Sequence, residues 1–311
     1  MMCEDCGCDS GAKTVAVNLQ TGKVTALDGE RHASGQGHGR EHVHADGTRH
    51  SHSHSHGTHH VHTHARADGP DRDRAPAHDH DHEHQHTSAP LVDLGIRVLA
   101  KNDALAARNR TWLADRGILA LNLMSAPGAG KTTLLERTIR DMKTGASLFV
   151  LEGDQATAND GERIRAAGAA VVQINTGTGC HLDADMVARG LLELNPSANS
   201  VVVVENVGNL VCPALFDLGE RRRIVILSTT EGDDKPLKYP HMFRAADLML
   251  VNKIDLLPYV EFDVSRATAN ALSVNPDISV LGVSARTGEG LDAWYAWLRQ
   301  EKSAACEAAA V

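Results

Sequence analysis

The sequence predicts an α/β domain with a doubly wound, mostly parallel sheet, preceded by a long polar N-terminal region. Three observations predict this fold class. Short, continuously apolar runs alternate with helical patterns through the last two thirds of the 311-residue chain, as expected of strands buried on both faces and of the helices that cover them. The first run leads directly into a glycine-rich turn. All ten aromatic residues lie after residue 91, so the core is expected there.

The N-terminal region divides into two parts. Residues 1–30 contain a cysteine cluster and a short apolar stretch at 14–19. Residues 31–89 contain 17 of the 19 histidines but only two large apolar side chains, both valine. Such a segment cannot bury enough apolar surface to offset the entropy of ordering it, so we expect a disordered, histidine-rich metal-binding tract. An affinity tag is the alternative, although tags are usually uninterrupted histidine runs.

A leading helix is predicted over residues 90–115, at the start of a domain that extends to residue 311. Its apolar residues recur every seven positions, which places them in one stripe on the helix. We expect this stripe to pack across the domain that follows. The stripe consists of Leu91, Val98, Leu105 and Trp112, flanked by Leu94 and Leu113.

Seven apolar runs follow, and each predicts a strand. They are 118–124, 147–151, 170–174, 201–204, 224–227, 248–251 and 278–283. Between them lie helix-like segments at 131–143, 158–167, 183–194 and 259–274, and a last helix begins near residue 291. In sheets of this kind, ligands bind at the carboxyl ends of the strands. The loops after the runs are therefore the expected positions of the site residues.

The first strand runs into Ser125-Ala-Pro-Gly-Ala-Gly-Lys-Thr-Thr133, which resembles a P-loop with Ser125 in place of its first glycine. Glycines let consecutive backbone N–H groups wrap around phosphates, and the helix that follows adds its positive dipole end. Lys131 is expected to reach the terminal phosphates, and the Thr132 hydroxyl to bind Mg²⁺. The candidate phosphate-binding residues are Gly128, Ala129, Gly130, Lys131, Thr132 and Thr133.

The segment Asn252-Lys-Ile-Asp255 follows the 248–251 run and resembles the N-K-x-D motif for guanine. The Asp255 carboxylate can accept hydrogen bonds from N1–H and the 2-amino group of guanine, and adenine offers no such pair of donors. Asn252 and Lys253 are expected to brace this loop. Ser284 and Ala285 lie in a later segment that resembles a base-contacting loop. Three motifs in this order, each after a predicted strand, predict a GTPase of the P-loop NTPase class.

Two acidic segments complete the predicted site. Glu205 follows the 201–204 run and begins E-N-V-G, which resembles the D-x-x-G switch, so its carboxylate is expected to hold Mg²⁺ through water and the Gly208 amide to sense the γ-phosphate. Asp154 is a candidate for positioning Mg²⁺ or the attacking water, and a helix N-cap ahead of 158–167 is the alternative. No arginine finger or catalytic glutamine can be assigned. The candidate catalytic residues are Lys131, Thr132, Asp154 and Glu205.

Three thiols lie within six residues in Cys3-x-x-Cys6-Gly-Cys8. Thiolates favour Ni²⁺, Zn²⁺ or Cu⁺, so this cluster predicts a metal site. The terminal amine is a candidate fourth donor, but Met2 moves it one residue further from the thiols. A thioredoxin-type redox pair is the alternative, and no strand–helix setting surrounds it.

Cys180-His181 and Cys212 form a second candidate set. Each segment follows a predicted strand, so both are expected at the carboxyl edge of the sheet. Two buried small hydrophobic residues and a surface histidine are an equally weighted alternative. In the tract, repeated His-x-His pairs are expected to bind several Ni²⁺, Zn²⁺ or Cu²⁺ ions loosely.

Several classes of function are disfavoured. The net charge is −9 and no basic block exists, which argues against nucleic-acid binding. The N-terminus lacks the basic and apolar regions of a secretory signal, and no apolar run approaches the length of a membrane span. We therefore expect a cytoplasmic protein with reduced cysteines and no membrane partner.

Taken together, these motifs make the chain similar to the hydrogenase nickel-incorporation GTPases, the HypB family. The resemblance covers the N-terminal cysteine motif and residues 91–301, including 152–157 and 205–210. It implies a cytosolic accessory GTPase with slow turnover that dimerises across the nucleotide, works with a partner metallochaperone and delivers Ni²⁺ to the large subunit of nickel–iron hydrogenase. By position, it implies a tight nickel site at Cys3, Cys6 and Cys8, and a nickel or zinc site at Cys180, His181 and Cys212.

Two rival functions remain. Urease accessory GTPases can also carry a histidine-rich start, but their metal motif is Cys-Pro-His, and here Ala214 follows Cys212-Pro213. The second rival is a nickel or zinc storage protein whose GTPase fold no longer turns over. Lys131 and the Asn252–Asp255 motif argue against a loss of nucleotide binding.

Overall fold

The structure is a computed structural model that describes residues 14–27, 40–43, 49–52, 89–142, 147–154, 159–177 and 179–309. The chain divides into two compact units, one of Met1–Gly29 with Leu91–Val311 and one of Glu30–Pro90. Within the described residues, no helix is both long and apolar enough to cross a bilayer.

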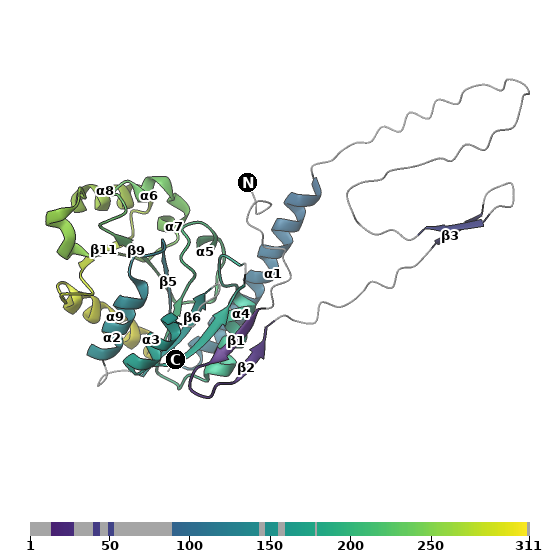
Figure 1. Ribbon diagram of the computed structural model, residues 1–311, viewed down its shortest axis with the longest axis horizontal. Helices are drawn as coiled ribbons and strands as arrows, with labels where there is room; N and C mark the ends of the chain where they lie inside the picture. Colours follow the sequence, from purple (N-terminus) through teal and green to yellow (C-terminus); the bar gives the residue numbers. More distant parts are fainter. Residues whose placement is uncertain are drawn as a thin grey trace, which may run out of the picture. The chain divides into compact units, whose positions relative to one another are not determined.

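The main unit is built on a nine-stranded sheet with the order β11-β10-β9-β5-β8-β6-β7-β1-β2 (Figure 1). The seven strands from β5 to β11 are mutually parallel, which confirms the doubly wound sheet. They correspond one to one with the seven predicted runs. Their bounds are β5 Leu119–Ser125, β6 Leu148–Asp154, β7 Ala170–Asn175, β8 Val201–Glu205, β9 Arg222–Ser228, β10 Leu248–Asn252 and β11 Ser279–Val283.

Helices cover both faces of this sheet, because successive strand residues point to opposite faces. On β5, Leu119, Leu121 and Leu123 pack with helices α2, α3 and α9, whereas Ala120 packs with α1 and α4. The principal helices are α1 Ala89–Ala114, α2 Lys131–Asp141, α3 Asn159–Ala167, α4 Ala184–Leu194, α8 Val264–Val274 and α9 Leu291–Ala309. Short helices are α5 Cys212–Leu215, α6 Lys235–Lys238 and α7 Pro240–Arg244.

The helix predicted at 259–274 begins later than expected. Residues Ile254–Tyr259 form a 3₁₀ helix that contains Pro258, and α8 starts only at Val264. Asp263 caps α8 by accepting a hydrogen bond from the Arg266 N–H at 3.0 Å. The cap, rather than the apolar pattern, therefore sets the start of this helix.

An N-terminal hairpin extends the sheet, which the sequence analysis does not predict. Strands β1 Val15–Asn18 and β2 Val24–Ala26 are antiparallel, and β1 pairs antiparallel with β7. The hairpin covers the edge of β7 and buries Ala16, which is 1% exposed. Residues 14–27 thus belong to the sheet of the main domain, whereas Cys3, Cys6 and Cys8 lie outside the described residues.

A second hairpin lies within the histidine-rich tract, where the sequence analysis predicts no regular structure. Strands β3 Arg40–Val43 and β4 Arg49–His52 pair antiparallel. The sequence between them contains Asp46-Gly47, a pair that favours tight hairpin turns. Neither strand shows an alternation of apolar and polar residues, so the composition of the tract did not reveal them. The other residues of the tract lie outside the described part of the chain.

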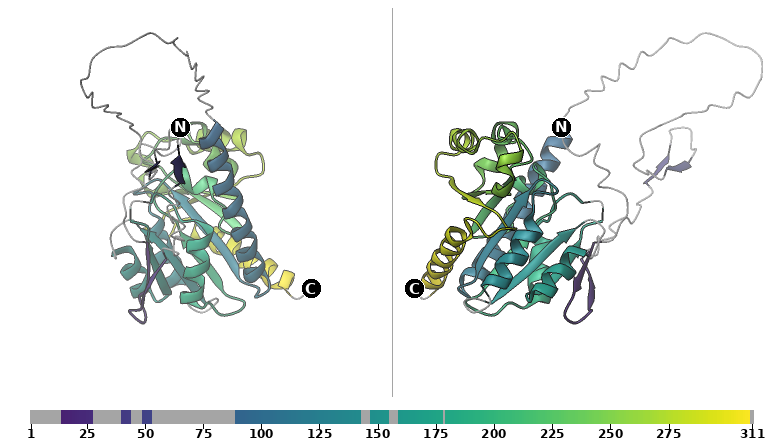
Figure 2. Two further views of the ribbon diagram at one scale, coloured as in Figure 1. Left: turned by 90° about the vertical axis from the view of Figure 1, so that its right-hand side faces the viewer. Right: turned by 60° about the vertical axis from the view of Figure 1, so that its left-hand side comes forward.

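Helix α1 runs alongside the main sheet (Figure 2), but with a different face inward from the predicted stripe. Val98 is 49% exposed, and Leu105 and Trp112 are only half-buried. The side chains that are fully buried are Asn102, Ala106, Asn109 and Leu113. Leu91 and Leu94 lie where no burial is described. The stripe prediction is therefore wrong for Val98, and the buried face is partly polar.

Hydrogen bonds explain why asparagines occupy this buried face. The Asn102 side chain accepts from the Ala184 N–H at 2.9 Å and donates to the Asp217 carbonyl at 2.8 Å. Asn109 donates to the Ala184 carbonyl at 2.8 Å and to the Leu218 carbonyl at 3.0 Å. Helix α1 is thereby tied both to the start of α4 and to the loop after α5. Such polar contacts between distant segments, rather than the spacing of apolar residues, determine which face of α1 is buried.

Candidate nucleotide pocket and metal centre

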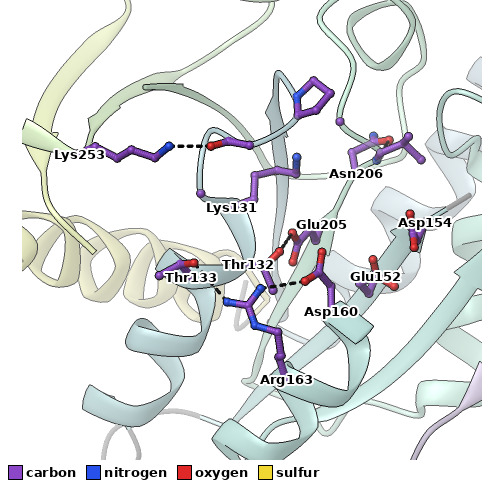
Figure 3. A pocket seen from close by; sticks show the side chains of 16 residues that line it. Lys131, Thr132, Thr133, Glu152, Asp154, Asp160, Arg163, Glu205, Asn206 and Lys253 are labelled. Carbon is purple, nitrogen blue, oxygen red and sulfur yellow. Dashed lines mark hydrogen bonds and ion pairs between the residues drawn. The ribbon is translucent and has the colours of Figure 1, made fainter. Parts of the chain in front are cut away.

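A pocket of about 490 Å³ opens at the carboxyl edge of the parallel sheet. The loop between β5 and α2 forms one side, and the ends of β6 and β8 and the first turns of α3 form the other (Figure 3). The pocket brings the glycine-rich loop next to the predicted acidic residues. Of the predicted site residues, Gly128, Gly130, Lys131, Thr132, Thr133, Asp154, Glu205, Gly208 and Lys253 line it.

The glycine-rich loop has the backbone geometry that phosphate binding requires. Gly130 begins α2 with a φ of +95°, and a Cβ at this position would lie 2.6 Å from Asn252 Nδ2, so no other residue fits. The Lys131 ammonium donates to the Ser125 hydroxyl at 2.9 Å, and burial lowers the pKa of Lys131. Ser125, which replaces the first glycine of the motif, therefore holds Lys131 at the rim of the loop.

The guanine-motif loop is tied to the phosphate loop. Asn252 Nδ2 donates to the Ala129 carbonyl at 2.9 Å, and Lys253 Nζ donates to the Gly128 carbonyl at 2.8 Å. Asn252 Oδ1 accepts from the Ala285 N–H at 3.3 Å. A smaller cavity of about 180 Å³ lies between these loops and is lined by Asp255 as well as by Gly130 and Lys253.

Asp255 faces this smaller cavity with one carboxylate oxygen already bound. The Ser284 hydroxyl donates to Asp255 Oδ1 at 2.7 Å. The structure thus brings together the phosphate loop at 125–133, the guanine-motif loop at 252–255 and the segment at 284–285. In the sequence, more than 150 positions separate the first of these segments from the last. A base seated beside Asp255 would share Gly130, Thr133 and Lys253 with the phosphate pocket.

Two glutamates form the acidic wall of the phosphate pocket. Glu152 and Glu205 are register partners on β6 and β8 and are 3% and 4% exposed. The Thr132 hydroxyl donates to Glu205 Oε1 at 2.7 Å, whereas Oε2 of each glutamate is buried with no hydrogen-bond partner. Burial, reinforced by the charge of Glu205, raises the pKa of Glu152 to about 9. Burial raises the pKa of Glu205 to about 7, against the opposing charge of Lys131.

This donor set fits a hydrated divalent cation such as Mg²⁺. Hard cations take carboxylate, hydroxyl and water oxygens, and two buried carboxylate oxygens here lack a donor. Asp154 ends β6 and lines the same pocket. Helix α3 starts at Asn159, and residues 155–158 between it and Asp154 lie outside the described part of the chain, so the capping role of Asp154 stays a prediction. Gly208 lines the pocket where a Cβ would meet Pro127 Cα at 3.1 Å.

The pocket contains residues that the sequence analysis did not predict, Asp160 and Arg163 as well as Glu152 and Asn206. The Arg163 guanidinium donates to Asp160 at 2.9 Å and to the Thr133 hydroxyl at 3.2 Å (Figure 3). It also donates to Glu136 at 2.9 Å. It is thus a cation held beside the first turn of α2. The place of Asp160 and Arg163 in the sequence could have indicated them, because the first turns of a helix that follows a parallel strand lie at the ligand-binding edge of the sheet.

The second cysteine set comes together at the same edge of the sheet. Cys180 Sγ lies 2.9 Å from Cys212 Sγ and 3.6 Å from His181 Nδ1. The three ligand atoms lie within 4.8 Å of one another, and all three side chains are half-buried. Within the described residues this is the one cluster of histidine, cysteine and acidic groups close enough to hold a metal ion.

The surroundings of His181 favour metal binding. Burial lowers the pKa of His181, which favours the neutral ring, the form that binds metals. The ring also stacks on Phe216, with centroids 4.0 Å apart. Two thiols and one imidazole are the donor set of Ni²⁺ and Zn²⁺ sites.

One buried side chain joins the phosphate pocket to the metal centre. Asn206 follows Glu205, is 1% exposed and lines the pocket. Its Oδ1 accepts from the Leu182 N–H at 3.2 Å and from the Val207 N–H at 3.0 Å. Leu182 is the residue directly after His181, so Asn206 lines the phosphate pocket and also contacts the backbone next to a candidate metal ligand.

The parallel sheet, the glycine-rich loop and the pocket define a P-loop nucleotide-binding protein. Residues 119–282 match the family model of the CobW/HypB/UreG nucleotide-binding domain. The chain belongs to the HypB family of hydrogenase maturation factors within that group, as two relatives show. It is 59% identical to hydrogenase maturation factor HypB of Rhizobium leguminosarum bv. viciae, over 65% of this chain and 67% of the relative. It is 54% identical to HypB of Escherichia coli K12, over 69% of this chain and 74% of the relative.

Solved structures of HypB proteins share the fold. The crystal structure of hydrogenase maturation factor HypB from Archaeoglobus fulgidus aligns with a TM-score of 0.62 at 41% identity, over 66% of this chain and 100% of that one. HypB from Helicobacter pylori, solved in complex with nickel, aligns with a TM-score of 0.61 at 37% identity, over 65% of this chain and 95% of that one.

Proposed function

We propose that this protein is a GTPase that binds nickel and delivers it for hydrogenase maturation, with the bound nucleotide controlling the metal. The observation that carries the proposal is the Asn206 connection between the phosphate pocket and the Cys180–His181–Cys212 centre. Relatives named as hydrogenase maturation factors and a related structure in complex with nickel support the same function.

For GTP hydrolysis, the backbone of residues 128–133 binds the phosphates, and Lys131 leaves Ser125 to reach the terminal phosphate. Thr132 and Glu205 would hold hydrated Mg²⁺, which would supply positive charge to neutralise the phosphates. Asp154 orients the water that attacks the γ-phosphorus, the bond to the β-phosphate breaks, and GDP and phosphate leave. We expect turnover to be slow, because no arginine finger or catalytic glutamine can be assigned from the sequence.

The choice of base is tested at Asp255. One oxygen of its carboxylate accepts from Ser284, which leaves the other oxygen for the guanine N–H donors. We expect the Asp255→Asn variant to lose at least tenfold in affinity for GTP and to gain affinity for xanthosine triphosphate, measured by fluorescence titration. Equal affinity of the unmodified protein for ATP and GTP would contradict this assignment.

The control of metal by nucleotide is tested with nickel titrations. In a full-length chain with Cys3, Cys6 and Cys8 changed to Ala and the histidines of residues 31–89 changed to Ser, the nickel affinity of the remaining centre is measured with GDP and with a non-hydrolysable GTP analogue. We expect the two affinities to differ severalfold, and by linkage nickel must change nucleotide affinity by the same factor. The Asn206→Ala variant should reduce this difference, whereas Asn209→Ala, two residues beyond Val207, should preserve it. Identical affinities in both nucleotide states would exclude a role of this centre in delivery.

The remaining parts of the chain have assigned roles in this proposal. Cys3, Cys6 and Cys8 form the tight nickel site, and residues 31–89 supply metal-binding capacity. Residues 90–311, together with the hairpin of residues 14–27, form the GTPase domain, whose centre takes nickel or zinc. The partners are a second copy of the chain, a metallochaperone and the hydrogenase large subunit in the cytoplasm. Deleting the gene should abolish hydrogenase activity at low nickel and leave urease activity intact.

A further inference from the structure

An arginine on α3 connects two helices at one wall of the phosphate pocket. Arg163 lines this pocket, and its Nη1 donates to Asp160 Oδ1 at 2.9 Å (Figure 3). Its Nη2 donates to the Thr133 hydroxyl at 3.2 Å and to Glu136 Oε2 at 2.9 Å, both on α2. The Arg163 side chain is 44% exposed, so hydrogen bonds rather than close packing hold it in place.

Thr133 marks the part of the site where the base and the phosphates of a nucleotide meet. It lines the phosphate pocket and also the smaller cavity beside Asp255, where the base is expected. Glu205 and Gly208, which are expected near the terminal phosphate, line the phosphate pocket alone. A nucleotide that extends from Asp255 to Gly208 therefore passes Thr133 with its first phosphate, the α-phosphate.

The positively charged side chains of the pocket lie at different parts of this path. Lys131 is expected at the terminal phosphates, and Lys253 is tied to the Gly128 carbonyl at 2.8 Å in the guanine-motif loop. Among the described residues that line the pocket, the third cation is Arg163. Its planar guanidinium can donate two parallel hydrogen bonds to a phosphate group, which makes it a stronger phosphate ligand than a lysine at the same place.

We propose that Arg163 binds the α-phosphate of the nucleotide, and that it leaves Glu136 to do so. The inference rests on the proposed function, because it requires GTP and GDP to bind in this pocket. The α-phosphate is common to both nucleotides. Arg163 therefore retains the nucleotide before and after hydrolysis, and it does not act on the γ-phosphate.

The hydrogens of the guanidinium show which contact has to be given up. Each terminal nitrogen of a guanidinium carries two hydrogens, and both hydrogens of Nη2 are used, one by Thr133 and one by Glu136. The Thr133 hydroxyl keeps its own proton to donate to a phosphate oxygen, so it can remain bound to Arg163. The Glu136 carboxylate only accepts hydrogen bonds and repels a phosphate, so it is the partner that the phosphate replaces.

The other contacts make this exchange feasible. Asp160 stays bound to Nη1, which keeps the guanidinium at the pocket while Nη2 changes its partner. Glu136 is 12% exposed, and Arg140 Nη2 already lies 3.5 Å from its Oε1. The Glu136 carboxylate therefore keeps a neighbouring cation when Arg163 leaves. In the empty pocket Glu136 competes with the nucleotide for Arg163.

The first test compares the two nucleotides. Dissociation constants of GDP and GTP are measured by fluorescence titration of the full-length protein with Mg²⁺. Arg163→Gln should weaken both by about tenfold and leave their ratio within about twofold of the original value, because both nucleotides carry the α-phosphate. Arg163→Lys keeps the charge without the planar fork and should recover part of the loss.

A matched control lies on the same helix. Arg165 belongs to α3 and pairs with Glu162 at 2.8 Å, and it does not line the pocket. Arg165→Gln removes the same charge from α3 and should change the affinity for either nucleotide by less than about twofold.

A second variant should change the affinity in the opposite direction. Glu136→Gln removes the charge that holds Arg163 in the empty pocket, so GDP and GTP should both bind about threefold more tightly. In a chain that already carries Arg163→Gln, the same substitution should have no effect. If Arg163 only held α3 against α2, Glu136→Gln would loosen the wall of the pocket and weaken the binding of both nucleotides.

The outcomes separate this inference from the function on which it rests. Weaker or unchanged binding in Glu136→Gln overturns the inference alone, and this variant decides the matter even if Arg163→Gln does not fold. A loss confined to GTP in Arg163→Gln places the arginine at the γ-phosphate and also overturns it. If the unmodified protein binds neither GDP nor GTP, the proposed function fails and the inference fails with it.

Discussion

Replacing Glu152 by glutamine should stabilise the nucleotide-free protein, and increasingly so as the pH rises. Burial and the neighbouring charge of Glu205 raise the pKa of Glu152 from 4.5 to about 9. The folded state thus keeps a proton that the unfolded chain releases above pH 4.5, so the free energy of unfolding falls by about 1.4 kcal/mol per pH unit across this window. At pH 7.5 the loss amounts to at most about 4 kcal/mol, and the neutral glutamine side chain avoids it.

The assay is urea unfolding of the full-length protein in a chelator, without nucleotide, at pH 6, 7, 7.5 and 8. We expect Glu152→Gln to exceed the unmodified protein by about 1–4 kcal/mol at pH 7.5, with a gap that widens with pH. Glu162→Gln is the control, because that carboxylate is half-exposed in a surface ion pair with Arg165, and its effect should stay below about 0.5 kcal/mol at every pH. A gap that is constant with pH, or a less stable variant at pH 8, would refute the reasoning.

Three further changes test packing and the metal centre. Asn109→Ala leaves two backbone carbonyls without their donor and should lower the free energy of unfolding by about 2–3 kcal/mol in urea titrations. Trp294→Phe removes a buried 3.0 Å hydrogen bond from the indole to the Thr138 hydroxyl and should cost about 1–2 kcal/mol, measured in the same way. Phe216→Ala removes the ring that stacks on His181 and should weaken nickel binding severalfold in direct titration, with GTP affinity unchanged.

The parallel strands could be predicted from sequence because they are buried on both faces, but their ends could not. Ser125, Asp154, Glu205 and Asn252 are each the last residue of a strand, one to three positions beyond the apolar run that predicted it. Backbone pairing continues past the last apolar side chain. These polar residues, which the sequence analysis assigned to loops, are therefore held by the hydrogen bonds between neighbouring strands. This is why the site residues are rigidly placed.

Other features depend on contacts between segments that are distant in sequence. The pairing of β1 with β7 joins residues about 160 positions apart, and no local pattern near Val15 indicates it. The buried asparagines of α1 are explained only by the carbonyl and amide groups that they meet. The composition of the Cys180–Cys212 set left metal ligation and simple burial equally weighted, whereas the 2.9 Å approach of the two sulfur atoms shows that they form one cluster.

The β1–β2 hairpin also fixes the N-terminal end of the histidine-rich tract, so the tract is held at both ends. Because β2 and α1 both belong to the main unit, the chain between Leu27 and Leu91 is a closed loop rather than a free tail. The entropy of closing a flexible loop grows only with the logarithm of its length, so doubling the tract costs about 0.6 kcal/mol. The number of histidines can therefore grow or shrink between related sequences almost without cost to the fold. Metal capacity and domain stability are, in this architecture, independently adjustable.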